Sequence, residues 1–396
     1  MLSDRIQNMT PSATVELAKR VAEFKRQGID IVNLNVGEPD FRTPDNINDA
    51  AYRAIAEGFT KYTSVNGIYE LRSAISKKLF DDNKLKYSPE EIIVSTGAKH
   101  ALVLAVFSIC NPGDEVIIPV PCWGSFIEVV KLAEGTPVIV RTEESNYFNL
   151  DINNIKAVLT PKTRAIIINT PNNPTGAVYD YDTLLALGQL AVQHDLYIIA
   201  DEIYEKLIYN GSVHTSIASL DEEIKKRTIL VNGVSKAYAM PGWRLGYAAA
   251  SQEIINGMCG LQGHFTTTTN SISQRAALEA LTGPQDNLAN MRAEYDRRRH
   301  YMYQRLNAMP GISCPNSSGA FFFLTNVSSL YGKVYNGALI KNSVDVSSFF
   351  LEVALVAVVP GETFYASDHI RISYSNSMDQ LVKGMDRMEA ALVQLS

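Results

Sequence analysis

A lysine followed closely by an arginine is the first set of residues in this sequence that could do chemistry. Lys236 comes after the apolar run 228–231, and Arg244 follows it beyond a short turn. A lysine amine forms a Schiff base with a carbonyl compound when its surroundings keep it partly neutral, and a nearby guanidinium suits a phosphate. The pair therefore indicates a site for a phosphorylated aldehyde. Since a lysine taken alone is usually a solvated surface residue, other groups must support this interpretation.

An acid and a phenol follow another apolar run. Asp201 directly continues the run 196–200, and Tyr204 comes shortly after it. A carboxylate at the inner end of such a strand is costly unless a cation pairs with it. A protonated pyridine nitrogen would be such a cation, and Tyr204 could reach a phenolate oxygen on the same ring. The alternative is that Asp201 caps the next helix.

Two further turns suit a flat, anionic ligand. Gly97, Ala98 and Lys99 open a helix after the predicted strand 91–95, where backbone N–H groups and the helix dipole favour a phosphate. Trp123 follows the predicted strand 115–119, and its ring could stack on a planar heterocycle. The plainer interpretations are a tight turn and a rim tryptophan that packs on the core.

An asparagine and an arginine complete the set. Asn173 stands in the turn 169–176, where two prolines and a glycine leave it little conformational freedom to lose. Arg371 lies in the segment 369–375, which alternates like a strand. Its guanidinium fork could bind the carboxylate of an α-amino acid in a bidentate manner, or it could form a surface ion pair.

Short apolar runs and helical patterns alternate along the chain, and this predicts the elements that position these residues. The predicted strands are 91–95, 115–119, 137–140, 165–169, 197–201, 228–232 and 246–250, and helices such as 98–109 and 181–194 lie between them. The pattern favours an α/β fold with a mainly parallel seven-stranded sheet, in which ligands bind outside the carboxyl ends of the strands. We expect a large domain over 48–285, and a smaller α+β domain formed by 286–396 together with the N-terminal segment 1–47.

Composition excludes several classes of protein. The 396 residues are 46% hydrophobic and carry a net charge of −6, which argues against a nucleic-acid-binding surface. The basic run 297–299 is predicted to be a solvated helix face. The four cysteines (Cys110, Cys122, Cys259 and Cys314) lack metal-site spacing and are expected to be buried free thiols. The same spacing predicts no metal site. Since no apolar stretch is long enough to span a membrane, we expect a cytoplasmic protein.

Taken together, these motifs resemble the class I aminotransferases of the fold-type I pyridoxal phosphate (PLP) enzymes. The resemblance covers essentially the whole chain. The matching strings are NVGEPDF (35–41), KY (61–62), PNNPTG (171–176), DEIY (201–204), SKA (235–237) with GWRLG (242–246), and RIS (371–373). Their combined order is far more specific than any one of them.

The resemblance implies a role for each matched position. Lys236 would bond covalently to PLP, Asp201 would hold the pyridinium proton, and Trp123 would stack on the ring. Asn173 and Tyr204 would bond the ring hydroxyl oxygen. The phosphate would be held by the backbone at Ala98 and Lys99, after Gly97, and by Ser235, Arg244, and Tyr62 of a neighbouring subunit. A homodimer is therefore implied. Arg371, Asn173 and the backbone at Gly37 would hold the substrate α-carboxylate.

The choice of substrate rests on a narrower resemblance, to the bacterial aspartate aminotransferases. Thr14, in the string 11–14, and Lys99 match the threonine and lysine that favour a distal carboxylate in that branch. Lys99 could equally be a solvated residue at a helix start. Thr10 stands where members that use prephenate carry a basic residue, which puts prephenate activity in doubt. Cys122 and Gly124, beside Trp123, also depart from the branch and loosen the expected pocket.

We therefore expect ping-pong transamination between aspartate or glutamate and a 2-oxo acid such as 2-oxoglutarate or oxaloacetate. Three alternatives stay open at this point. One is a broad-range aromatic aminotransferase, and another is a PLP-dependent carbon–sulfur lyase, because a scaffold does not choose its reaction. The third is a ligand sensor of the kind fused to a DNA-binding domain, which the acidic composition and the retained Lys236 disfavour.

Overall fold

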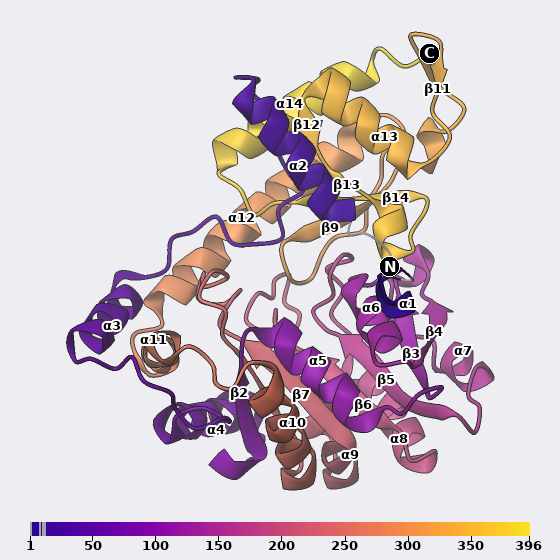
Figure 1. Cartoon of the computed structure of the whole chain (residues 1–396). Coiled ribbons are helices and arrows are strands. Elements are labelled where there is room, and N and C mark those ends of the chain that lie inside the picture. The colour runs from indigo at the N-terminus through magenta and orange to yellow at the C-terminus, as the bar shows by residue number, and fades with distance from the viewer. Residues whose placement is uncertain (1, 8, 10–12) are drawn as a thin grey trace.

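A large sheet forms the centre of the lower part of the molecule in Figure 1, and a second layered unit lies above it. The computed structural model describes residues 2–7, 9 and 13–396, without the side chains of residues 4, 5 and 13–15. The sheet has seven strands in the order β2-β8-β7-β6-β5-β3-β4. They are β2 (Ile92–Ser95), β3 (Glu115–Val120), β4 (Thr136–Arg141), β5 (Thr163–Asn169), β6 (Tyr197–Asp201), β7 (Thr228–Gly233) and β8 (Gly246–Ala249).

The seven-stranded α/β prediction is confirmed. Each predicted strand is present, with its ends shifted by two residues at most. Only β8 runs antiparallel to its neighbours β2 and β7, whereas the other pairs are parallel. The carboxyl ends of β2, β3, β5, β6 and β7 therefore meet at one edge of the sheet, and the chain enters β8 at that same edge.

Helices cover both faces of the sheet, as its solid Ile and Val runs require. Alternate side chains of one strand, such as Ile167 and Ile168, enter different core clusters on opposite faces. One face packs on α5 (Ala98–Ile109), α6 (Ser125–Leu132) and α10 (Gln252–Phe265). The other packs on α7 (Ile152–Ala157), α8 (Tyr181–Gln193) and α9 (Glu222–Arg227). The β2 end also packs on α3 (Asp45–Ala56), α4 (Tyr69–Asn83) and α11 (Ser271–Thr282).

The upper unit is built on a three-stranded antiparallel sheet of order β13-β14-β9. Its strands are β9 (Phe322–Asn326), β13 (Val359–Pro360) and β14 (His369–Ser373), and β1 (Val32–Asn33) pairs in parallel with β12 (Val356–Ala357) nearby. The N-terminal stretch is thereby attached to the C-terminal part of the chain. The helices are α2 (Ala13–Arg26), α12 (Asp286–Ala308), α13 (Ser343–Phe349) and α14 (Met378–Leu392), and α12 runs from the lower part into the upper one in Figure 1.

Several short elements complete the described chain. They are α1 (Asp4–Gln7), the hairpin of β10 (Val334–Tyr335) and β11 (Ala338–Leu339), five single 3₁₀ turns at Pro89–Glu91, Glu144–Asn146, Ile217–Ser219, Ser328–Leu330 and Gly361–Phe364, and a π-helical turn at Phe350–Ala354. None of the helices in the described part of the chain is long and apolar enough to cross a membrane. All four cysteines are free, but only Cys122 and Cys314 are fully buried.

The prediction that residues 297–299 form a solvated face was wrong for two of the three arginines. Arg297 is exposed, whereas Arg298 and Arg299 are buried in α12. The Arg298 guanidinium donates to Asp40 Oδ1 at 2.7 Å and to Glu294 Oε1 at 2.8 Å, and Arg299 pairs with Asp296 at 2.7 Å. A buried charge persists when it is paired and hydrogen-bonded, and Asp40 comes from a distant segment that the local pattern cannot indicate.

Candidate active site

Strands β5 and β6 end side by side and bring the predicted asparagine turn to the predicted acid. In the sheet register Asn169 is opposite Asp201, and Asp201 is opposite Val231 of β7. The Asn169 side chain donates from Nδ2 to the Asp201 carbonyl at 2.9 Å and accepts from the Asn173 N–H at 2.8 Å. Asn169 therefore fixes the start of the turn against the end of β6. The sequence places Asn169 in the turn 169–176 but indicates no role for it.

Asp201 is a buried acid whose charge state depends on its surroundings. Burial raises the pKa of Asp201 to about 7, and the charge of Glu202 adds to this, although a hydrogen bond from the Ile203 N–H and the charge of Lys236 oppose it. Since burial disfavours the charged form, a cation against this carboxyl group would favour ionisation. The sequence predicted an acid in need of a cation, and the structure places such an acid here.

Lys236 lies over the same edge of the sheet. Its Nζ donates to the Gly37 carbonyl at 2.5 Å and stands 5.9 Å from the ring centres of both Tyr204 and Phe321. Burial lowers the pKa of Lys236 to about 8, with Arg371 and Arg244 acting in the same direction. An amine with this pKa is partly neutral near physiological pH, which is what a nucleophilic lysine needs.

Tyr204 lies beneath Lys236 in an aromatic wall. Its ring packs edge-on against Phe321 at 5.4 Å and Phe322 at 5.9 Å between centroids. Burial raises the pKa of Tyr204, so the phenol keeps its proton and remains a hydrogen-bond donor.

Arg371 and Asn173, which the resemblance assigns to one substrate carboxylate, contact each other in the structure. Arg371 Nη1 donates to Asn173 Oδ1 at 2.9 Å, and Nη2 donates to the Asn35 carbonyl at 2.7 Å. The guanidinium carbon lies 4.4 Å from the ring centre of Phe322 and 4.9 Å from that of Phe364. Its Nε is buried without a hydrogen-bond partner in the described chain, which leaves a donor for an anion. Burial lowers the pKa of Arg371 to about 10.

The Gly97 turn is built for close approach. Gly97 has φ +83°, and a Cβ there would lie 2.5 Å from Arg244 Nη2, whereas a Cβ on Gly246 would lie 2.2 Å from the Ala98 nitrogen. The first N–H groups of α5, those of Ala98 and Lys99, have no carbonyl to bond within the helix. Arg244 therefore stands over a helix N-terminus, and this combination suits a phosphate.

Trp123 and Lys99 lie together at the carboxyl end of the sheet. Lys99 Nζ is 4.5 Å from the centre of the Trp123 ring, and the tryptophan also packs edge-on against Phe126. Burial and the charge of Arg244 lower the pKa of Lys99. Lys99 is exposed in this chain, as expected of a solvated helix-start lysine, but it also contacts Trp123.

Three other predicted residues are less closely engaged. Ser235 is buried next to Lys236, and Tyr62 is 87% exposed on the surface of this chain. Thr14 lies in α2 but its side chain is outside the described part, and residues 10–12 are outside it altogether.

The structure also adds residues that the sequence did not single out. Asn35 belongs to a string that matches the aminotransferases, so the sequence could have indicated it. No feature of the sequence indicated Phe364. Both are joined to Arg371 only by the tertiary fold.

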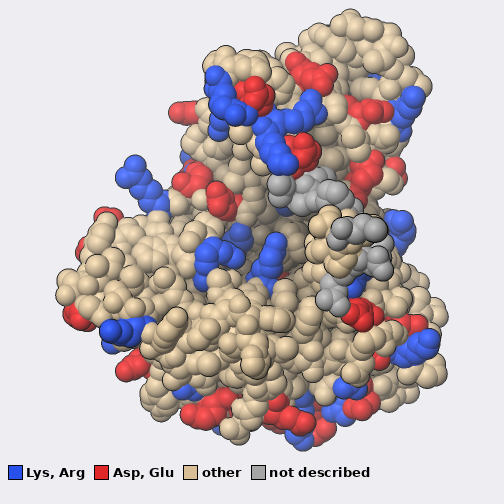
Figure 2. Space-filling model, in the orientation of Figure 1, with Lys and Arg blue, Asp and Glu red and all other residues tan. Residues whose placement is uncertain are grey.

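Positive side chains gather around this site. Figure 2 shows Lys and Arg side chains in the recess between the upper and lower parts of the molecule. Such a concentration of cations in a recess favours a ligand with phosphate or carboxylate groups.

The family model for aminotransferase class I and II matches residues 29–387 of this chain. The chain belongs to this aminotransferase family. It is 44% identical over 389 residues to an aspartate aminotransferase of Bacillus sp. (strain YM-2), a match that covers 98% of each chain. Among solved structures, the aspartate aminotransferase of Rhizobium meliloti has a TM-score of 0.97 at 40% identity and covers 100% of each chain. That of Thermus thermophilus with maleate has a TM-score of 0.93 at 42% identity and covers 99% of each.

Proposed function

We propose that this aminotransferase exchanges the amino group of aspartate or glutamate with a 2-oxo acid, with 2-oxoglutarate and oxaloacetate as the acceptors. One observation carries the proposal. The Lys236 amine interacts electrostatically with Asp201, Arg244 and Arg371 at once. A lysine, a carboxylic acid and two arginines therefore lie close enough to act on one amine, and these are the kinds of group that the proposed reaction needs.

The residues fit pyridoxal phosphate. Asp201 would hold its pyridinium nitrogen, Lys236 its aldehyde, and Trp123 one face of its ring. The Gly97 turn, with Arg244 and Ser235, would hold its phosphate. Asn173 and Tyr204 would bond its ring oxygen. When bound, this cofactor supplies an electron sink for the substrate Cα electrons.

The chain's own groups would then perform the proton transfers and the binding. Arg371, with its unpartnered Nε, orients the α-carboxylate of the substrate. Lys236 Nζ would take the proton from the substrate Cα and release it again, as the base and acid of the reaction. Its pKa of about 8 suits a base that must gain and lose a proton near neutral pH. Release of the first 2-oxo acid before the second binds gives ping-pong kinetics.

A preference for an acidic side chain is the finer part of the proposal. Lys99, which contacts Trp123, would be the cation for the distal carboxylate. Thr14 is proposed to favour the same carboxylate, as the resemblance implies. The names of the relatives support this preference, and the Thermus structure contains maleate, a dicarboxylate. They do not favour the aromatic or carbon–sulfur lyase alternatives. We propose in addition a cytoplasmic homodimer with Tyr62 reaching the neighbouring phosphate, and domain boundaries near residues 47 and 285.

The test is a half-reaction followed by absorbance. Aspartate and glutamate should convert the PLP form of the protein to the pyridoxamine form, and borohydride should fix the cofactor on Lys236 in the wild type. The variant Lys236→Ala should show neither change. An unmoved spectrum at saturating aspartate and glutamate would refute transamination, and formation of pyruvate and ammonia from cysteine conjugates would point to the lyase.

A further inference from the structure

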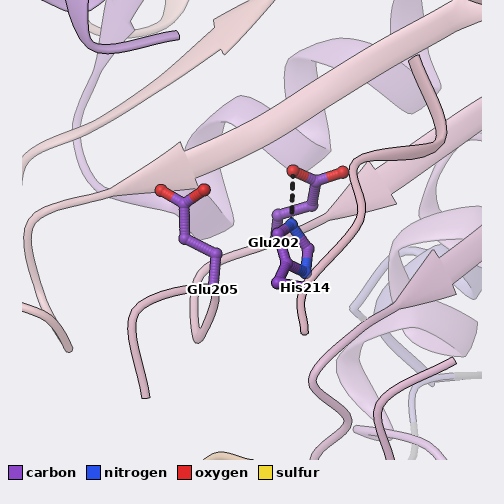
Figure 3. Close-up of side chains that lie close together, drawn as sticks. All are labelled: Glu202, Glu205 and His214. Atoms are coloured by element: carbon purple, nitrogen blue, oxygen red, sulfur yellow. Dashed lines mark hydrogen bonds and ion pairs between the residues drawn. The ribbon is translucent and has the colours of Figure 1, made fainter. Parts of the chain in front are cut away.

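The turn that carries Asp201 and Tyr204 has a second, buried polar face. Glu202 and Glu205 alternate with those two residues and are 1% and 7% exposed. Figure 3 shows their carboxylates beside His214, whose ring lies directly against Glu202. None of these three residues has a role in the proposed reaction. A buried acid needs a compensating cation, so each of these two glutamates should have a positively charged group beside it.

Lys78 is the counter-ion of Glu205. The Lys78 ammonium donates to Glu205 Oε1, and the amides of Asn83 and Asn232 donate to the same carboxylate at 2.8 and 2.9 Å. Although burial alone would raise it, the charge of Lys78 lowers the pKa of Glu205 to about 2. Possible ligand atoms of Glu202, Glu205 and His214 lie within 4.8 Å of one another. Because an ammonium already neutralises Glu205, the cluster does not require a metal ion.

His214 lies against Glu202. His214 Nε2 lies 3.1 Å from Glu202 Oε2, and the Ser216 hydroxyl donates to Oε1 at 2.7 Å. The imidazole is itself buried, with 6% of its side chain exposed. Burial lowers the pKa of His214, but the charge of Glu202 outweighs this and leaves it raised. The imidazole is therefore the group placed to act as counter-ion to this acid.

Among the residues that the structure describes, the two lysines near this cluster are both paired with other acids. The charged groups that face His214 are Glu202, Glu205 and Lys78. Beyond them, Lys206 pairs with Asp82 at 2.7 Å, and Asp82 also lies 3.7 Å from Lys78. Both lysines are thus committed to other acids. If His214 were neutral, Glu202 would keep an uncompensated charge in a buried place adjoining Asp201.

We propose that His214 is a positioning residue that acts through Glu202: it neutralises the acid behind Asp201 and so leaves the Asp201 carboxylate free to hold a cation on its other face. This inference rests on the proposed role of Asp201. The direction follows from Coulomb's law, because a negative charge behind Asp201 draws the shared proton from the cation onto Asp201. The positive charge of His214 cancels that pull.

The experiment measures the Asp201 carboxyl group in the full-length protein freed of cofactor. The protein is labelled with ¹³C at the aspartate carboxyl carbon, the Asp201 signal is assigned by its loss in Asp201→Asn, and its titration is followed by NMR. The test variant is His214→Gln, whose amide nitrogen can take the place of Nε2 but cannot carry the charge. The double variant with Glu202→Gln removes both charges together. The control is His369→Gln, since His369 Nε2 also lies 3.1 Å from a glutamate oxygen, Glu144 Oε2, in a less buried pair.

His214→Gln should raise the pKa of Asp201 by about one unit or more, a tenfold rise in its proton affinity. The double variant should return it to the wild-type value or below, and His369→Gln should leave it unchanged. In the PLP-loaded protein the half-reaction with aspartate should slow in His214→Gln and recover in the double variant. An unchanged Asp201 titration in His214→Gln, or a shift that persists in the double variant, would overturn the inference. The titration needs no cofactor, so failure of Lys236 labelling would count only against the proposed function.

Discussion

Replacing Arg371 by lysine separates the charge of this residue from its geometry. The guanidinium has five N–H donors, and two of them are used within the chain, on Asn173 Oδ1 and on the Asn35 carbonyl. Five less two leaves three donors for a substrate carboxylate, including the unpartnered Nε. A lysine has three donors. If two of them satisfy Asn173 and Asn35, one remains, and the bidentate grip is lost.

The expected cost is one charge-assisted hydrogen bond to the carboxylate, about 1.5–3 kcal/mol. This corresponds to a loss of roughly 10- to 150-fold in kcat/KM. Arg371→Leu removes the charge as well and leaves the acceptors of Asn173 and Asn35 unsatisfied, so its loss should reach roughly 30- to several-thousand-fold. Both variants keep the cofactor ligands, and their absorbance with PLP should resemble that of the wild type.

The assay is the single-turnover half-reaction with aspartate and, separately, with alanine. A residue that holds the α-carboxylate should cost both substrates a similar factor, because alanine has no second carboxylate. Arg305→Lys is the matched control, since Arg305 pairs with Asp386 and Glu389 away from the site and should react as the wild type does. The reasoning fails if Arg371→Lys reacts at the wild-type rate, or if aspartate loses rate while alanine does not.

Three further predictions use the same geometry. Gly97→Ala places a Cβ 2.5 Å from Arg244 Nη2 at a φ of +83°. The resulting strain of about 1–3 kcal/mol should weaken PLP binding by roughly 5- to 150-fold in a fluorescence titration. Wild-type affinity in this variant would contradict the prediction. The cofactor-free protein needs the neutral Lys236 amine to bind PLP covalently. The rate of PLP binding should therefore rise with pH and level off above a pH of about 8. A rate that does not depend on pH in stopped-flow absorbance would exclude this pKa. Arg298→Met removes the cation of Asp40, whereas Glu294 keeps Arg297, so the variant should destabilise the fold by about 1.5–3 kcal/mol in urea unfolding. Arg297→Ala should change the midpoint little because that arginine is exposed, and equal losses in the two variants would contradict the reasoning.

Much of the fold and of the candidate site was predictable because both rest on local patterns. Runs of Ile and Val bounded by turn residues specify strands covered on both faces, and β6 begins and ends where the sequence predicts. Polar residues that follow such runs must lie at the carboxyl edge of a parallel sheet. Asp201 and the turn that holds Asn173 were therefore expected at one edge of the sheet, and the register of β5 with β6 puts Asn169, at the start of that turn, opposite Asp201.

Charge pairing was not predictable in the same way. The run 297–299 has the composition of a solvated helix face, yet Arg298 is buried because Asp40 comes to it from far along the chain. Likewise, nothing local to Glu202 indicates that His214 and Ser216 meet it on the opposite face of the turn. A charged residue can be buried only where a partner arrives, and the partner's position is a property of the whole fold.

The sequence by itself determined the order of strands and helices, the chemistry at the strand ends, and the resemblance to aminotransferases, because each depends on neighbours within a few residues. The tertiary structure alone decided which donors of Arg371 remain free, how far burial shifts the pKa values of Lys236 and Asp201, and which cations stand behind the acids. These depend on distances between segments remote in the chain, and electrostatic energies change steeply with such distances and with exclusion of water.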